Sequence, residues 1–199
     1  FKYNNNADDD SSSKVFSGNF IEGKRNGFGV EYDKLGQAVY IGTWANNMRL
    51  GEGKELVNEK EVYVGEFLND KRDGEGREKY SNGEVKYYGN FVRGKYEGKG
   101  TLFYEDGEKQ YEGEFKNGLA HGKGQYYINN KLDYDGYWIK DKRNGHGVMY
   151  IDGKEDYNGL WENDMQKEPQ EAKIAIKREN DEVVDGKSPI SGKKKRRKN

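Results

Sequence analysis

Residues 111–127 read YEGEFKNGLAHGKGQYY, and glycine and aromatic residues recur through this stretch at fixed distances. It begins with Tyr111, Gly113 and Phe115, each two residues from the next, and a Gly-x-Gly pair follows. In a β-strand, residues two apart share one face, so this spacing places two rings on one face with a gap between them. A ring from a neighbouring strand can lie in that gap, directly on the backbone.

The same pattern repeats along the chain, with starts 24, 23, 24, 24, 23 and 23 residues apart. A Gly-x-Gly pair follows eleven residues after each of the first six starts, whereas the seventh unit keeps only its first half. Repeats at such a period are typical of stacked supersecondary units. The units start at Phe16, Tyr40, Tyr63, Tyr87, Tyr111, Tyr134 and Tyr157.

Turn-forming residues punctuate each unit and indicate a β-hairpin. They stand seven residues after each start, and Asn82-Gly83, Asp106-Gly107 and Asp152-Gly153 mark turns between units. We therefore predict an all-β fold, an elongated single antiparallel sheet of stacked hairpins of about 23 residues each. The turn formers within the units are Gly23, Asn47, Asp70, Gly94, Gly118, Asp141 and Asp164.

The predicted array spans residues 16–168, between an N-terminal linker (1–15) and a basic, flexible C-terminal tail (169–199). Hydrophobic residues make up 32% of the chain and aromatic residues 14%, which suits a thin core of flat rings on bare backbone. The chain has no cysteine and no apolar run of membrane-spanning length, so we expect a soluble intracellular protein. Because it begins with Phe1, we expect it to be a piece of a longer chain.

The repeated pattern resembles MORN repeats (membrane occupation and recognition nexus), whose motif reads roughly Tyr-x-Gly-x-Trp/Phe, a turn, then Gly-x-Gly and an aromatic. The resemblance covers six full units and a half. Two units depart from it, because Leu56 and Lys79 stand where other units carry an aromatic residue such as Phe103 or Tyr127, and their strand register stays open. Residues 121–130, HGKGQYYINN, are similar to the middle repeats of radial spoke head proteins.

Catalytic and cofactor chemistry is not predicted for this chain. The Gly-x-Gly pairs lack the third glycine of a dinucleotide fingerprint, and no phosphate-binding loop signature occurs. A zinc site needs three or four converging ligands, and His121 and His146 are the only histidines. The serines show no nucleophile motif. From these three observations together we predict no cofactor, no metal site and no enzyme activity.

The first candidate binding surface is the aromatic face of the sheet. The rings either form the core that covers the glycines or, on a curved sheet, line a groove for an extended or helical peptide. Aromatic residues are also favoured at the centres of protein interfaces. The groove candidates are Tyr40, Trp44, Tyr63, Phe67, Tyr87, Phe91, Tyr111, Phe115, Tyr134 and Trp138.

Two basic segments offer further surfaces. Three Lys-Arg doublets occupy equivalent turn positions and would line one edge: Lys24 and Arg25, Lys71 and Arg72, and Lys142 and Arg143. Residues 16–169 nevertheless carry 23 Lys+Arg against 28 Asp+Glu, a net charge of −5, and membrane binding needs a dense basic patch. The tail ends in the run Lys193, Lys194, Lys195, Arg196, Arg197 and Lys198, which is typical of nuclear targeting, of contact with acidic surfaces or of a solubilising tail.

The sequence therefore predicts a non-catalytic scaffold that binds protein partners, with self-association open through the exposed sheet end. The resemblance implies a cytoplasmic, cytoskeletal setting, and we favour a ciliary axoneme and its radial spokes. The alternative is a regulatory or acidic-phospholipid-targeting module of a larger enzyme such as a phosphatidylinositol phosphate kinase. We rank phospholipid below protein as a partner, do not expect nucleic acid, and predict no transmembrane segment; a nuclear protein using the basic tail is a third reading.

Overall fold

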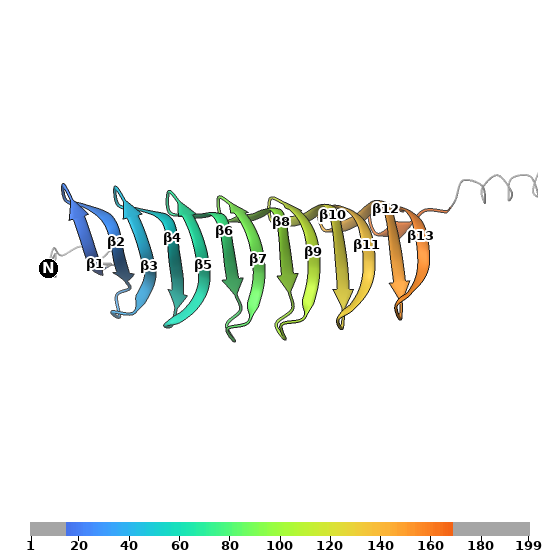
Figure 1. Ribbon diagram of the computed structural model, residues 1–199, viewed down its shortest axis with the longest axis horizontal. Coiled ribbons are helices and arrows are strands. Elements are labelled where there is room, and N and C mark those ends of the chain that lie inside the picture. Colours follow the sequence, from blue (N-terminus) through green and yellow to red (C-terminus); the bar gives the residue numbers. More distant parts are fainter. Residues whose placement is uncertain (1–14, 169–199) are drawn as a thin grey trace, which may run out of the picture.

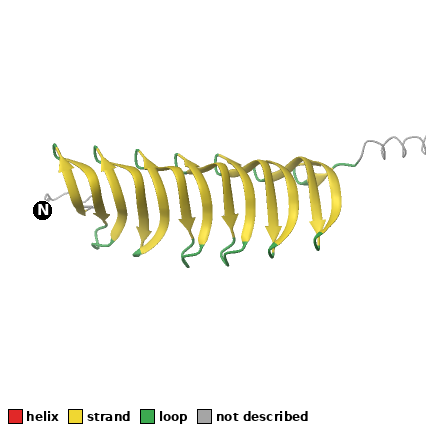
Figure 2. Ribbon diagram, in the orientation of Figure 1, coloured by secondary structure: helices red, strands yellow, loops and turns green. Residues whose placement is uncertain are grey.

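The computed structural model describes residues 15–168, which consist of strands and turns throughout (Figure 2). This part of the chain contains no helix of the length and apolarity that a membrane crossing requires. The strands are β1 (Val15–Ile21), β2 (Lys24–Tyr32), β3 (Ala38–Ala45), β4 (Met48–Val57), β5 (Lys60–Leu68), β6 (Lys71–Lys79), β7 (Val85–Val92), β8 (Lys95–Phe103), β9 (Lys109–Lys116), β10 (Leu119–Ile128), β11 (Lys131–Ile139), β12 (Lys142–Ile151), β13 (Lys154–Glu162) and β14 (Met165–Gln166).

The strands form one 14-stranded sheet whose spatial order is the sequence order, β1 to β14. Every neighbouring pair is antiparallel, from β1 with β2 to β13 with β14. Figure 1 shows the result as a long row of curved hairpins with the two ends of the sheet far apart. The predicted fold, a single open antiparallel sheet of stacked hairpins, is confirmed.

The turns within the units all lie on one long edge of the sheet, which we term the hairpin edge. Each is a two-residue turn with positive φ at both positions, for example 49° at Glu22 and 74° at Gly23. Such turns match the twist of the flanking strands. The opposite, junction edge has two-residue turns at Asn58–Glu59, Asn129–Asn130 and Asp152–Gly153 and longer loops at 33–37, 80–84 and 104–108.

A column of glycines crosses the sheet and sets how close the rings lie to the backbone. Gly42 stands opposite Gly53, which stands opposite Gly65, and equivalent pairs continue to Gly147 and Gly159. The ring that opens each unit, Phe16 in unit one and a tyrosine in the others, lies across this column. A Cβ added at Gly53 would lie 2.3 Å from the Tyr40 hydroxyl oxygen and 2.6 Å from the ring. No larger residue fits there, and the predicted contact between rings and bare backbone is confirmed.

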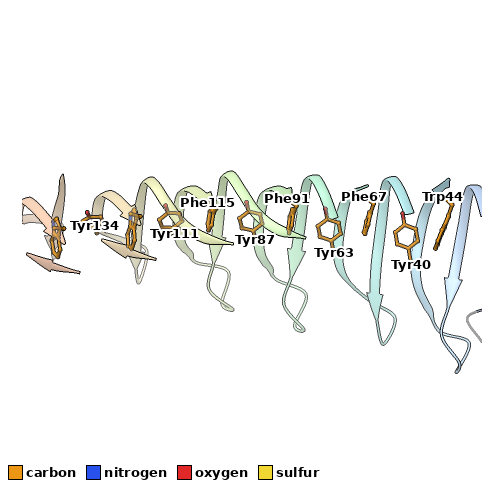
Figure 3. Packing of buried hydrophobic residues seen from close by; sticks show 12 residues of the cluster. Tyr40, Trp44, Tyr63, Phe67, Tyr87, Phe91, Tyr111, Phe115 and Tyr134 are labelled. Carbon is orange, nitrogen blue, oxygen red and sulfur yellow. The ribbon is translucent and has the colours of Figure 1, made fainter. Parts of the chain in front are cut away.

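The core is a single line of rings along the sheet (Figure 3). Successive rings meet edge to face, with centroids 5.2 Å apart in Tyr40–Trp44 and 5.0 Å apart in Tyr40–Phe67. The contacts continue unit by unit to Tyr157, whose ring centroid lies 5.3 Å from that of Trp161. Aromatic pairs favour this T-shaped arrangement. The ring line therefore connects each unit to the next.

Units two and three keep the register of the others. A one-residue shift separates Glu55 from Leu56 and Glu78 from Lys79, as it separates Tyr126 from Tyr127 in unit five. The register depends on the glycine column and the turns, which all units share. An aromatic residue at this position is therefore not required for the register. Lys79, which stands there in unit three, donates a hydrogen bond to Glu61 at 2.9 Å.

Candidate interaction surfaces

The ten residues predicted to line a groove lie in the core. Their exposed fractions run from 0% for Tyr40 to 8% for Trp138. Neighbouring rings and glycine backbone enclose them, which favours the alternative in which the rings cover the glycines. A partner could touch these rings only by displacing the residues above them, so their direct role in partner binding stays a prediction. The residues buried in this way are Tyr40, Trp44, Tyr63, Phe67, Tyr87, Phe91, Tyr111, Phe115, Tyr134 and Trp138.

A second layer of side chains covers the rings, and in units one to three it is ionic. Arg25 lies 4.2 Å above the Trp44 ring, and Arg49 lies 4.5 Å above the Tyr40 ring. Glu31 is 2% exposed and accepts hydrogen bonds from Arg25 at 3.0 Å and from Arg49 at 2.7 Å. The line continues through Glu55, Arg72 and Glu78.

In units four and five the covering layer is largely apolar, and in unit six Met149 lies beside Arg143, which covers the Trp161 ring. Tyr96 stacks on Tyr87 with ring centroids 3.7 Å apart, in the place that arginine takes in units one to three. The Tyr96 hydroxyl donates a hydrogen bond to Glu78 at 2.9 Å, where the ionic and apolar halves meet. The ring face therefore changes character halfway along the sheet. The half-buried apolar residues over this part of the core are Tyr96, Leu102, Tyr126 and Met149.

The basic doublets lie on the hairpin edge, but their two residues point to opposite faces of the sheet. Arg72 turns over the Tyr63 ring at 4.4 Å and pairs with Glu55, whereas Lys71 is exposed. Strand geometry explains the difference, because adjacent residues face opposite ways. The other doublets behave alike: Arg25 and Arg143 cover Trp44 and Trp161, while Lys24 and Lys142 are exposed. Of the six basic residues in the doublets, the three lysines are therefore exposed on the edge, whereas the three arginines lie over the rings.

Replacing Arg72 with alanine should lower the free energy of unfolding by about 1–2 kcal/mol, because its guanidinium covers a buried ring and neutralises two glutamates. This range is modest because the Arg72 side chain is 22% exposed and water screens its ion pairs. Lys71→Ala is the matched control and should change it by less than about 0.5 kcal/mol. Urea denaturation of both variants measures the difference, and equal effects would show that the arginine layer adds no stability.

The tyrosine hydroxyls donate hydrogen bonds to backbone carbonyl groups at the β-bulges. The register shifts between Gly89 and Phe91, and the Tyr87 hydroxyl donates to the carbonyl oxygen of Asn90 at 3.0 Å. Bulges interrupt the hydrogen-bond ladder, so the hydroxyl satisfies a carbonyl there. Burial raises the pKa of Tyr40 and of Tyr134 from the usual 10 to about 12, so these hydroxyls stay protonated as donors even in moderately alkaline solution. The sequence analysis did not foresee this role of tyrosine.

The two histidines and the carboxylates within residues 15–168 do not form a metal-binding cluster. His121 is half-buried on β10 and His146 is exposed on β12. No group of three or more His, Cys, Asp or Glu residues within 15–168 is placed to hold a metal ion. The face of the sheet opposite the rings has hollows of about 510 and 540 Å³, both lined by Glu75 and Tyr88. Residues 1–14 of the predicted linker 1–15 and the tail 169–199, with the basic run 193–198, lie outside the described residues, whereas Val15 begins β1.

Comparison with known proteins matches a family profile to six segments of the chain. The profile is that of the MORN repeat, and the segments together cover more than half of the sequence: 16–34, 40–56, 63–85, 87–109, 111–131 and 134–154. The chain belongs to the MORN-repeat family. A search of curated proteins gave no match. The MORN array is itself non-catalytic, and β13 extends it beyond the matched segments, because Trp161 packs against Tyr134 at 5.3 Å.

Proposed function

We propose that the MORN array is a protein-binding scaffold of a cytoskeletal assembly. The observation that carries this proposal is the unbroken line of rings from Phe16 to Tyr157, supported by a sheet in which every strand pairs with the next. Fourteen strands about 4.8 Å apart extend over about 60 Å. Such a body presents a long, fixed surface, and the apolar cover over units four and five offers a protein partner an area to bury.

A ciliary axoneme, with its radial spokes, is the setting that we propose for this scaffold. The support is the likeness of residues 121–130 to repeats of radial spoke head proteins, together with the scaffold architecture. The second candidate is a module that targets acidic phospholipid, favoured by the exposed Lys24, Lys71 and Lys142 on one edge. The two candidates differ in what should hold the protein in place.

Fractionation of isolated cilia separates the two candidates. We expect the native protein to stay with the axoneme after non-ionic detergent and to leave it only in high salt, because protein contacts hold it. Immunoblots of the detergent and salt fractions provide the measurement, with a known membrane protein and a known axonemal protein as references. Complete release by detergent would reject the scaffold proposal in favour of membrane attachment, and absence from cilia would reject the axonemal setting.

A further inference from the structure

The hairpin edge carries a row of exposed apolar side chains, one in every unit. Each sits in the residue pair that closes the turn, such as Leu68 opposite Lys71 and Val92 opposite Lys95. The exposed fractions range from 38% for Met48 to 63% for Met165. The row consists of Ile21, Met48, Leu68, Val92, Leu119, Ile139 and Met165.

Lysine is the partner of the apolar residue in five of these seven closing pairs. The five are Lys24, Lys71, Lys95, Lys116 and Lys142, all exposed. None of the five forms an ion pair within residues 15–168. The row is therefore both apolar and cationic.

The aspartates in the turns of the same edge are engaged by the backbone, whereas Glu22 in the first turn is exposed. Asp70 accepts a hydrogen bond from the Arg49 amide at 2.9 Å, and Asp141 accepts one from the Ala120 amide at 2.7 Å. Asp164 does the same for Arg143. These carboxylates join the turn of one unit to the strand of the unit before it. The lysines are consequently most of the charge that this edge offers to a partner, and Glu22 stands against them in the first unit alone.

We propose that the hairpin edge binds an acidic, amphipathic α-helix of a protein partner along its length. This inference rests on the proposed scaffold function and names the partner's chemistry. Closing pairs recur every two strands, about 10 Å apart. A helix rises about 10.5 Å in seven residues, so a heptad repeat presents one apolar stripe and one set of glutamates to each closing pair.

Two other occupants fit the edge less well. An added β-strand needs free backbone groups, and at this edge the strands run into closed turns rather than presenting an open ladder. An acidic membrane would meet more than the row itself. Exposed Glu52, Glu66, Glu75 and Glu114 lie on the same face of the sheet beside it and would repel anionic lipid. A helix is narrow enough to contact the closing pairs alone.

The junction edge supplies a matched comparison. It has similar closing pairs, Val57 with Lys60, Ile128 with Lys131 and Ile151 with Lys154. Longer loops interrupt them, and two of the lysines are engaged: Lys60 donates to the Ser81 carbonyl at 3.2 Å, and Lys131 pairs with Asp152. A helix cannot run along this edge without meeting the loops.

The test uses the full chain and a labelled synthetic peptide of 35 residues in five heptads, with leucine at a and d and glutamate at e and g. Fluorescence anisotropy should show binding to the wild-type chain that weakens with salt. The hairpin-edge variant Leu68→Ser, Val92→Ser, Ile139→Ser should raise Kd at least tenfold. The junction-edge variant Val57→Ser, Ile128→Ser, Ile151→Ser removes side chains of similar exposure and should change Kd less than twofold.

A second pair of variants tests the charges. Lys71→Glu, Lys95→Glu, Lys142→Glu should abolish binding of the acidic peptide, whereas Lys99→Glu, Lys123→Glu, Lys154→Glu should leave at least half of the affinity. The same peptide with lysine in place of glutamate should not bind. Circular dichroism confirms that each variant keeps its sheet.

Several outcomes would overturn the proposal: no binding of the acidic peptide, equal losses in the two edge variants, or equal binding of the lysine peptide. Binding of phosphatidylserine vesicles through the same lysines, without peptide binding, would assign the edge to a membrane instead. Retention of the protein in detergent-extracted axonemes is measured separately. A scaffold that stays in the axoneme while failing the peptide test would refute only the helix-binding edge.

Discussion

Replacing Tyr87 with alanine should lower the free energy of unfolding by about 3–5 kcal/mol, the largest effect that we expect from one side chain. Tyr87 is 0% exposed, and its ring centroid lies 5.2 Å from those of both Phe91 and Phe115. Its loss opens a cavity in the middle of the ring line and removes the stacking partner of Tyr96. Because each unit is stabilised by its neighbours, the cavity should also uncouple the two halves of the array.

Urea denaturation followed by circular dichroism measures this effect, and Tyr87→Phe is its control. Phenylalanine keeps the ring and loses the hydrogen bond to the Asn90 carbonyl, so it should cost about 0.5–1.5 kcal/mol. A single transition in the wild-type chain that separates into two in Tyr87→Ala would show the uncoupling directly. Equal stabilities of the two variants would mean that ring packing contributes little to the fold.

Replacing Gly100 with alanine should cost about 3 kcal/mol, the second largest effect that we expect, because the added methyl group has no room. A Cβ at this position would lie 2.3 Å from the Tyr87 hydroxyl oxygen and 2.6 Å from ring carbons. Tyr87 cannot move away, since Phe91, Tyr96 and Phe115 surround it. Either the ring leaves the core or the strand shifts, and thermal or urea unfolding of the variant measures the loss.

Two comparisons isolate the steric cause of this loss. Gly94→Ala places a methyl group in open space at a turn with φ of 81°, and should cost only about 1 kcal/mol through backbone strain. Gly100→Ala in a Tyr87→Ala background should add little, because the clashing ring is gone. Additive costs in the double variant would contradict the clash and would point to a backbone effect at Gly100.

The fold could be predicted from the sequence because its determinants are local. The spacing of Tyr111, Gly113 and Phe115 fixes a strand face, and turn formers such as Asn47 close the hairpins. The turns at Asn58–Glu59 and Asn129–Asn130 are not predicted, because they lack glycine and do not recur at a fixed position of every unit, as the turn at Asn47 does. Asparagine tolerates the left-handed conformation at such positions, so the signal was present but weaker.

The candidate surfaces were harder to predict, because face and burial depend on neighbouring strands. The sequence shows Lys71 and Arg72 as one basic doublet, yet the strand separates them onto two faces. The layer over the rings has a sequence signal nine residues after each unit start: arginine in units one to three, then Tyr96, Ala120 and Arg143. That position looks unremarkable until the structure places it above the core. The row on the hairpin edge was likewise invisible, since its residues stand at two different positions of the repeat, before the turn in some units and after it in others.

The direction of the hydrogen bonds has a mechanical consequence. Each strand crosses the long axis of the molecule, so the bonds that hold successive strands together point along that axis. A force that pulls on the two ends of the chain would peel the terminal strands one after another, and each would yield without help from the rest of the sheet. A load that presses along the same axis meets packed rings and closed turns instead. The array should therefore withstand compression along its long axis better than tension.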